Sequence, residues 1–283
     1  MQRIMITGAG GQLGQKLIGA ARALPEDVRI FAYNRSTLDI TKPVDLRAAF
    51  AEAQPDCVFN AAAYTAVDRA ESEPDKARKV NVEGVRRLAA VCHEQGIRLV
   101  HFSTDYVYDD GYNRPLRESD RTLGTSVYAR TKLEGENMVL RHHPEAFIIR
   151  TSWVYAEYGE NFLRTMIRLG SERENLGIVA DQVGTPTYAA DLAAATFRLV
   201  QSDAPGGIYN YANSGAASWY DFAHYIFELQ GIGCDLRPIR TEQYPTPAKR
   251  PTYSVLDTKK ISAYVGTPRN WREAVRECVG KVK

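Results

Sequence analysis

The feature that most constrains the fold is a glycine-rich turn near the start of the chain. Residues 3–14 read RIMITGAGGQLG, in which an apolar run over 3–7 predicts a strand and residues 13–24 predict a helix. Gly8 permits a tight turn, Gly11 lets the backbone approach a pyrophosphate, and Gly14 allows the helix to pack closely on the strand. This context favours a phosphate site at the helix N-terminus, with Gln12 and Leu13 beside it. A simple packing turn is the alternative.

Predicted strands and helices alternate along the first half of the chain. Strands are expected over residues 28–33, 56–60, 97–102 and 147–150, and helices over 44–53 and 75–95, while the charged segment 67–73 is expected to be irregular. Such alternation is typical of an α/β fold with a parallel sheet. We therefore predict a Rossmann-type doubly wound sheet as an NAD(P)-binding domain over residues 1–150.

The remainder, residues 151–283, is predicted to form a smaller α/β substrate-binding region. Its expected helices span residues 189–200, 219–228 and 271–279, and short strands are expected near 207–211 and 236–239. The boundary at residue 150 is approximate, because pieces of the second region are expected to pack at the edge of the sheet.

The end of the second predicted strand indicates which nicotinamide cofactor is used. An acidic residue there would bind the ribose 2′-hydroxyl of NAD, but this chain has Asn34 followed by Arg35. A guanidinium suits a 2′-phosphate, so the sequence favours NADPH, with NADH as the alternative. Asp39 and Ile40 follow closely and are predicted to reach the adenine edge, with Asp39 either capping a turn or contacting the cofactor.

The third predicted strand is followed by small residues. Ala62 and Ala63 would leave room for a flat ligand beside the backbone, and Tyr64 and Thr65 come next. We include these four among the predicted cofactor-binding residues. Close helix packing explains the alanines equally well.

A tyrosine and a lysine four residues apart supply the predicted chemistry. Tyr128 and Lys132 would share one helix face, and the ammonium is expected to lower the pKa of the phenol and make it a usable general acid. Thr104 and Asp105 follow the fourth strand, where a hydroxyl can donate a hydrogen bond to a carbonyl oxygen. This spacing arises easily by chance, but the ends of parallel strands converge at one edge of a sheet, which favours the catalytic interpretation.

Composition excludes several other functions. The formal net charge of +2 is too small to indicate a nucleic-acid surface, and the sequence contains no apolar run of the length that a membrane span requires. The four cysteines are scattered without a C-x-x-C pair, so we predict reduced thiols, a cytoplasmic protein and no metal site.

Several longer motifs are distinctive: NAAAYTAVDRAESEP (60–74), HFSTDYVYD (101–109), VYARTKLEGE (127–136), RTSWVYAEYGENF (150–162), DQVGTPT (181–187) and RPTYSVLD (250–257). With them the chain closely resembles the dTDP-4-dehydrorhamnose reductase family of extended short-chain dehydrogenases/reductases. The resemblance runs nearly from end to end. Ala129 and Arg130 depart from the usual family residues without removing a catalytic group. Some members bind magnesium through acidic residues, but Gln15 lies near one such position.

The resemblance implies NAD(P)H-dependent reduction of the C4 ketone of dTDP-4-dehydro-L-rhamnose, the last step of dTDP-L-rhamnose biosynthesis. It implies that Thr104, Asp105, Trp153, Asn161 and Arg250 contact the substrate, with Arg250 at the diphosphate, and that the protein is a monomer or homodimer. Two alternatives stay open. One is another 4-keto-sugar reductase that gives the C4 epimer, and the other is a non-catalytic, cofactor-binding regulatory subunit.

Overall fold

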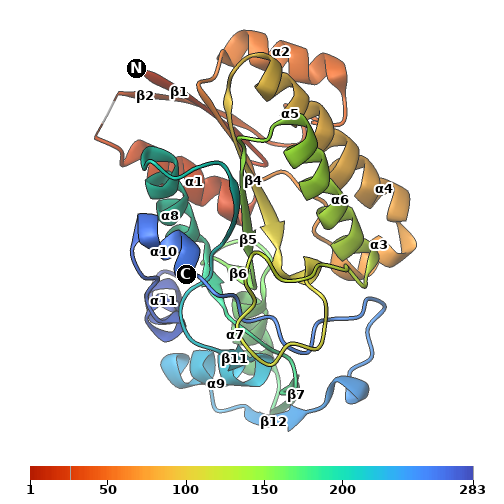
Figure 1. Ribbon diagram of the computed structural model, residues 1–283. Helices are drawn as coiled ribbons and strands as arrows, with labels where there is room; N and C mark the ends of the chain where they lie inside the picture. Colours follow the sequence, from red (N-terminus) through yellow and green to blue (C-terminus); the bar gives the residue numbers. More distant parts are fainter. Residues whose placement is uncertain (26, 283) are drawn as a thin grey trace.

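A six-stranded parallel sheet forms the centre of the protein (Figure 1). The computed structural model describes residues 1–25 and 27–282. The strands lie in the order β2-β1-β3-β4-β5-β10. Their bounds are Gln2–Thr7 (β1), Val28–Tyr33 (β2), Cys57–Asn60 (β3), Arg98–Thr104 (β4), Phe147–Thr151 (β5) and Gly207–Asn210 (β10). The strand order reverses between β1 and β3, and in doubly wound sheets ligands bind at the carboxyl ends of the strands beside such a reversal.

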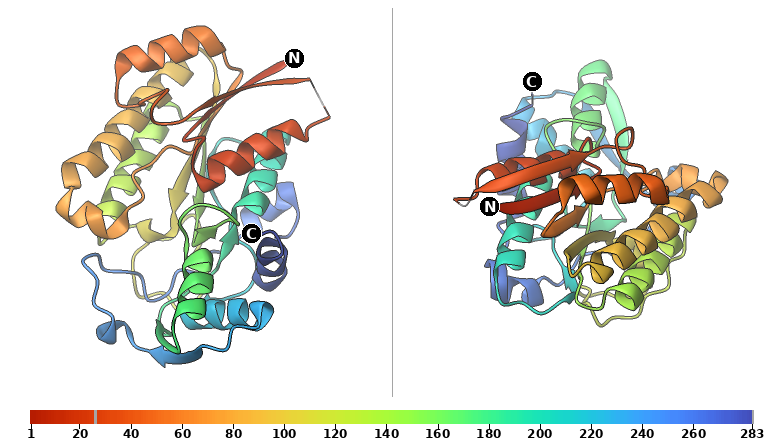
Figure 2. Two further views of the ribbon diagram at one scale, coloured as in Figure 1. Left: turned by 180° about the vertical axis from the view of Figure 1, so that it is seen from behind. Right: turned by 90° about the horizontal axis from the view of Figure 1, so that it is seen from above.

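Helices cover both faces of this sheet (Figures 1 and 2). One face carries α1 (Gln12–Arg22), α8 (Ala189–Gln201) and α10 (Lys259–Val265), and the other carries α2 (Pro43–Ala53), α5 (Val85–Glu94) and α6 (Val127–His142). Successive side chains of a strand point to opposite faces, so Ile4 and Ile6 join the first layer while Met5 joins the second. The doubly wound prediction is confirmed.

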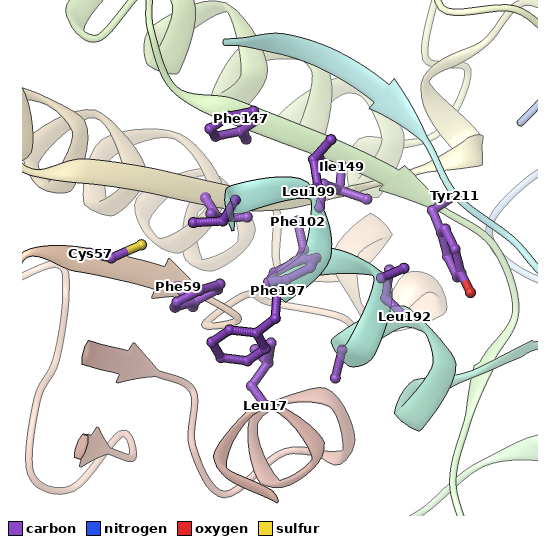
Figure 3. Packing of buried hydrophobic residues seen from close by; sticks show 14 of the residues in the cluster. Leu17, Cys57, Phe59, Phe102, Phe147, Ile149, Leu192, Phe197, Leu199 and Tyr211 are labelled. Atoms are coloured by element: carbon purple, nitrogen blue, oxygen red, sulfur yellow. The ribbon is translucent and has the colours of Figure 1, made fainter. Parts of the chain in front are cut away.

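The core beneath α1 and α8 joins the two halves of the sequence. Phe197 of α8 packs on Phe59 of β3 with ring centroids 4.7 Å apart, and Leu17 of α1 belongs to the same buried cluster (Figure 3). Together with β10, α8 therefore makes part of the region after residue 150 integral to the central sheet.

The other segments after residue 150 build a smaller region below the sheet in Figure 1. Its helices are α7 (Phe162–Glu172), α9 (Trp219–Gln230) and α11 (Trp271–Val279), which surround a separate hydrophobic cluster. Its strands pair in twos: β6 (Val154–Tyr155) with β9 (Thr187–Tyr188), β7 (Asn175–Val179) with β12 (Asp235–Ile239), and β8 (Val183–Gly184) with β11 (Ala217–Ser218). None of the helices in the described residues is both long and apolar enough to cross a membrane.

Two expectations about local structure change. Residues 67–73 were expected to be irregular, but α3 (Val67–Ser72) is a helix, because Ala70 is fully buried beside α6 while the charged residues around it face outward. The expected helix 75–95 is present as α4 (Pro74–Arg78), a π-helical turn η1 (Lys79–Gly84) and α5. Turns of this kind within helices occur frequently at functional sites.

Candidate active site

A cleft of about 1130 Å³ opens at the carboxyl ends of β1, β3 and β4, and loops of the smaller region form its other wall. Every residue predicted to bind the cofactor lines it. The list is Gly8, Gly11, Gln12, Leu13, Gly14, Asn34, Arg35, Asp39, Ile40, Ala62, Ala63, Tyr64, Thr65, Tyr128 and Lys132. Thr104, Asp105 and Trp153 line it as well. The structure therefore brings the predicted cofactor and catalytic residues to one place.

The glycine turn has the geometry that a phosphate cradle requires. Gly8 has a φ of +69°, and a Cβ there would lie 2.5 Å from the carbonyl carbon of Ala61. A Cβ on Gly14 would lie 2.3 Å from the carbonyl oxygen of Gly8. Helix α1 follows with Gly11 at its N-cap and no side chain capping it. Its first N–H groups are thus available to an anion, so the turn fits a dinucleotide pyrophosphate.

Hydrogen bonds within the loop after β2 fix its conformation. Asn34 Oδ1 accepts hydrogen bonds from the backbone N–H groups of Ser36 (2.9 Å) and Thr37 (3.2 Å). Asp39 Oδ1 accepts from the backbone and hydroxyl of Thr41 at 2.9 and 2.7 Å, so it does cap a turn. Arg35 is exposed at the rim of the cleft, where its guanidinium is free to meet a phosphate.

The π-helical turn joins the loop after β3 to the tyrosine helix. The Asn81 amide accepts from the Tyr64 backbone N–H at 2.9 Å and donates to the Tyr64 carbonyl at 3.1 Å. It also donates to Thr131 Oγ1 at 3.1 Å, and Thr131 donates to the carbonyl of Tyr128 at 2.9 Å. The cleft wall at Tyr64 is therefore tied to α6.

Helix α6 presents Tyr128 and Lys132 to the cleft. The helix begins after Ser126, whose side chain accepts from the Ala129 N–H. Lys132 donates to the carbonyl oxygen of Phe102 at 2.7 Å. Burial lowers the pKa of the Lys132 ammonium to about 8, while the Glu136 carboxylate one turn away opposes this. Glu136 is itself buried in an ion pair with Arg150, at 2.7 Å.

The expected lowering of the Tyr128 pKa is wrong. Burial raises the pKa of Tyr128 to about 12; hydrogen bonding with Thr104 opposes this, and the Asp105 carboxylate adds to it. The Lys132 ammonium, which donates to the Phe102 carbonyl, does not outweigh the effect of burial on this pKa. The phenol is therefore fully protonated at neutral pH, which is the form that a proton donor needs.

Thr104 and Asp105 lie at the end of β4, where the 3₁₀ turn η2 (Asp105–Val107) begins. The Thr104 hydroxyl donates to Asp105 Oδ1 at 3.1 Å and accepts from the Tyr106 N–H at 3.3 Å. Burial raises the pKa of Asp105 to about 7, although the hydroxyls of Ser254 and Thr104 pull it down. Tyr106 packs edge-on to Tyr128, with ring centroids 5.8 Å apart.

Trp153 lies on the side of the cleft formed by the smaller region. Its φ is +45°, which is unusual for a bulky residue and, when held by surrounding structure, is often associated with a functional site. Its indole stacks on Trp219 at 3.5 Å between centroids with an interplanar angle of 7°. Two parallel indoles thus form part of the cleft wall.

Asn161 and Arg250 are not among the residues that line the cleft. Asn161 caps α7 and donates to Gln12 Oε1 at 2.8 Å, so it connects this helix to the phosphate turn. Arg250 forms a bidentate pair with Asp68 at 2.7 and 3.0 Å. Their substrate contacts remain predictions.

Other cleft-lining residues were not predicted from sequence. They include Ser36, Tyr106, Tyr158 and Trp219. Trp219 directly follows Ser218, the N-cap of α9, and a tryptophan beside a helix cap was the only sequence signal. Tyr158 is positioned by a tertiary contact, from its hydroxyl to the carbonyl of Gln12 at 3.2 Å, that no local pattern encodes.

The glycine turn beside the reversal of strand order, together with the Tyr128–Lys132 helix, defines an NAD(P)-dependent oxidoreductase of the extended short-chain dehydrogenase/reductase class. A model of the RmlD substrate binding domain family matches residues 1–283. The chain belongs to this family.

Individual relatives match over nearly their full length. The dTDP-4-dehydrorhamnose reductase of Aggregatibacter actinomycetemcomitans is 40% identical, with 98% of each chain covered. The dTDP-4-keto-6-deoxy-D-glucose reductase of Streptomyces niveus is also 40% identical, with 97% of this chain and 96% of the relative covered. The solved structure of dTDP-4-dehydrorhamnose reductase from Bacillus anthracis in complex with NADP is 36% identical, covers 100% of both chains and has a TM-score of 0.92.

Proposed function

We propose that the protein reduces the C4 ketone of dTDP-4-dehydro-L-rhamnose to dTDP-L-rhamnose with NADPH. This proposal rests mainly on one observation: Tyr128, Lys132 and Thr104 all line the cleft that begins at the glycine turn. The names of the Aggregatibacter and Bacillus relatives support the substrate, and NADP in the Bacillus structure supports the cofactor.

The residues that would hold the cofactor follow from the cleft geometry. The N–H groups at the start of α1 would bind the pyrophosphate, Arg35 the 2′-phosphate, and the loop Ala62–Thr65 would lie along the ring systems. When bound, the cofactor supplies the hydride for C4.

The chain itself supplies the proton. Negative charge develops on the ketone oxygen as the carbonyl is reduced, and Tyr128 donates its hydroxyl proton to that oxygen. Thr104 donates a hydrogen bond to the same oxygen. The Lys132 ammonium lies one turn from Tyr128 and stabilises the phenolate that proton transfer leaves.

A turnover assay tests this function. Purified protein, dTDP-4-dehydro-L-rhamnose and NADPH should give loss of NADPH absorbance, with one equivalent of reduced sugar whose C4 configuration NMR identifies as L-rhamno. Binding of NADPH without turnover of the keto sugar would instead support the regulatory-subunit alternative.

The Streptomyces relative favours a second candidate substrate. Its name specifies reduction of dTDP-4-keto-6-deoxy-D-glucose at the same level of identity. The two sugars differ in ring stereochemistry while the ketone is at C4 in both. Comparing kcat/KM for the two keto sugars decides between them, because specificity is the ratio of these values.

A further inference from the structure

The Thr104 hydroxyl has a single proton and several possible partners. Its oxygen accepts from the Tyr106 backbone N–H at 3.3 Å, and its proton points to Asp105 Oδ1 at 3.1 Å. The Tyr128 hydroxyl is a further partner, because it hydrogen-bonds with Thr104, and both residues line the cleft. Thr104 therefore cannot donate to Asp105 and to a substrate oxygen at the same time.

The charge on Asp105 decides which group accepts the hydrogen bond that the Thr104 hydroxyl donates. An ionised carboxylate only accepts hydrogen bonds, so the Thr104 hydroxyl donates to it and not to a substrate oxygen. A carboxylic acid with its proton on Oδ1 donates to the Thr104 oxygen, which turns this hydrogen bond around. The Thr104 proton is then free to point into the cleft.

The surroundings of Asp105 favour the neutral acid. The residue is 2% exposed, and its Oδ2 is buried with no partner within hydrogen-bond geometry among the described residues. A buried carboxylate with one oxygen left unpaired is costly, which favours the protonated acid. The cations nearby are committed elsewhere, since Lys132 bonds the Phe102 carbonyl and Arg250 pairs with Asp68.

The other groups that face Asp105 do not neutralise it. Tyr106 from η2 and Tyr128 from α6 have pKa values raised by burial, so both are uncharged near neutral pH. Ser254, from the segment after Arg250, offers only a hydroxyl. The rise of the Asp105 pKa to about 7 agrees with this geometry.

We propose that Asp105 is a positioning residue that sets the direction of the Thr104 hydroxyl, and that only its protonated form lets Thr104 donate to the ketone oxygen. The inference rests on the proposed function for its chemical role. Below pH 7 Asp105 is protonated and Thr104 can donate; above pH 7 it is ionised and Thr104 is held back.

The pH profile of kcat/KM tests the inference, because this quantity reports ionisations of the free enzyme. For the wild type, kcat/KM should fall about tenfold between pH 6 and 8. In Asp105→Asn the amide donates to Thr104 at every pH, so the fall of kcat/KM should shrink to about twofold or less. A tenfold fall that persists in Asp105→Asn would overturn the inference.

Two further variants separate positioning from a general effect of charge. Thr104→Val should be slow and should also lack the fall, because the effect of Asp105 passes through the Thr104 hydroxyl; a fall that remains would contradict the inference. Asp68→Asn removes a neighbouring carboxylate whose pKa is lowered by hydrogen bonding with Arg250. It should keep the fall, and losing it would assign the ionisation to Asp68.

A measurement without turnover keeps the inference testable if the proposed substrate is wrong. Carbon-13 NMR of protein labelled at aspartate carboxyls should show one resonance titrating near pH 7, absent in Asp105→Asn. If every aspartate titrates below about pH 5, Asp105 is ionised at neutral pH and the inference fails. Absence of turnover in the wild type at all pH values would instead remove the proposed function.

Discussion

Tyr128 is placed so that its proton stays in position until charge develops beside it. Burial raises the pKa of the phenol to about 12, and the nearest ammonium, Lys132, is held by a carbonyl. The Tyr128 phenol is thus protonated at neutral pH and can act as the general acid that ketone reduction requires.

Tyr128→Phe removes that proton and little else. We expect kcat to fall by about 10²- to 10⁴-fold, the usual contribution of a general acid. Affinity for NADPH, measured by its fluorescence on binding, separates the loss of the proton from the contact that Tyr128 is predicted to make with the cofactor. Wild-type turnover in this variant would contradict the proposed role of Tyr128.

Arg35 is the residue that we expect to distinguish the two cofactors. It is exposed beside the cleft, and a hydrogen bond to a charged group contributes about 1.5–3 kcal/mol. Arg35→Ala should therefore raise the Kd of NADPH by roughly 10- to 150-fold. NADH is the internal control, because it lacks the 2′-phosphate and should bind almost as before. Equal changes in both Kd values would exclude Arg35 from that site.

At the scale of elements, the two glycines of α1 differ in their surroundings: an added side chain would meet close neighbours at the start of the helix and open space further along it. Gly14 lies where a Cβ would overlap the Gly8 carbonyl, whereas Gly19, five residues further along the same helix, has nothing within 4 Å of such a Cβ. One helix thus contains a glycine required by packing and one that is not.

This contrast gives a matched pair of variants. Gly14→Ala should destabilise the fold by about 1–3 kcal/mol, the usual cost of overpacking, and should weaken NADPH binding by displacing the turn. Gly19→Ala should stabilise it by about 0.5–1 kcal/mol, because alanine has the better helix propensity. Urea unfolding measures both. Equal destabilisation by the two substitutions would refute this account of the turn.

The elements that the sequence predicted well are those whose signals are local. The strand before Gly8 and the helix of Tyr128 each have a clear pattern and a cap or turn beside them. β7 was not predicted, because it contains Gly177, which is unusual in strands, and pairing with β12 makes it a strand; β12 itself was expected near residues 236–239 although it contains Pro238. Likewise, the pKa of Tyr128 depends on burial by distant segments, which its spacing from Lys132 does not encode.

At the scale of the molecule, the central sheet is completed late in the sequence. β10 pairs with β5 in parallel, and α8 packs beside α1. The α/β class and the cofactor end were predictable because they come from repeated local units. It was harder to predict that residues 189–210 pack on the central sheet, since a short strand such as Gly207–Asn210 does not specify which strand it pairs with.

A chain ending at residue 150 should therefore not fold as an independent domain. It would lack β10 and α8, which leaves the edge of β5 unpaired and the apolar side of α1 uncovered. We expect no cooperative thermal transition by circular dichroism and strong binding of a hydrophobic dye, with the full-length protein as control. A cooperative transition in the shortened chain would show that residues 1–150 suffice.

The return of α8 to α1 also affects how the protein is made. During translation α1 leaves the ribosome long before α8 is synthesised, and at about 5–20 residues per second the interval is roughly 10 to 40 s. Throughout this interval Leu17 and Ala21, both buried in the finished protein, lack part of their covering. The nascent chain thus exposes the apolar side of α1 to chaperones well before the nucleotide cleft has formed.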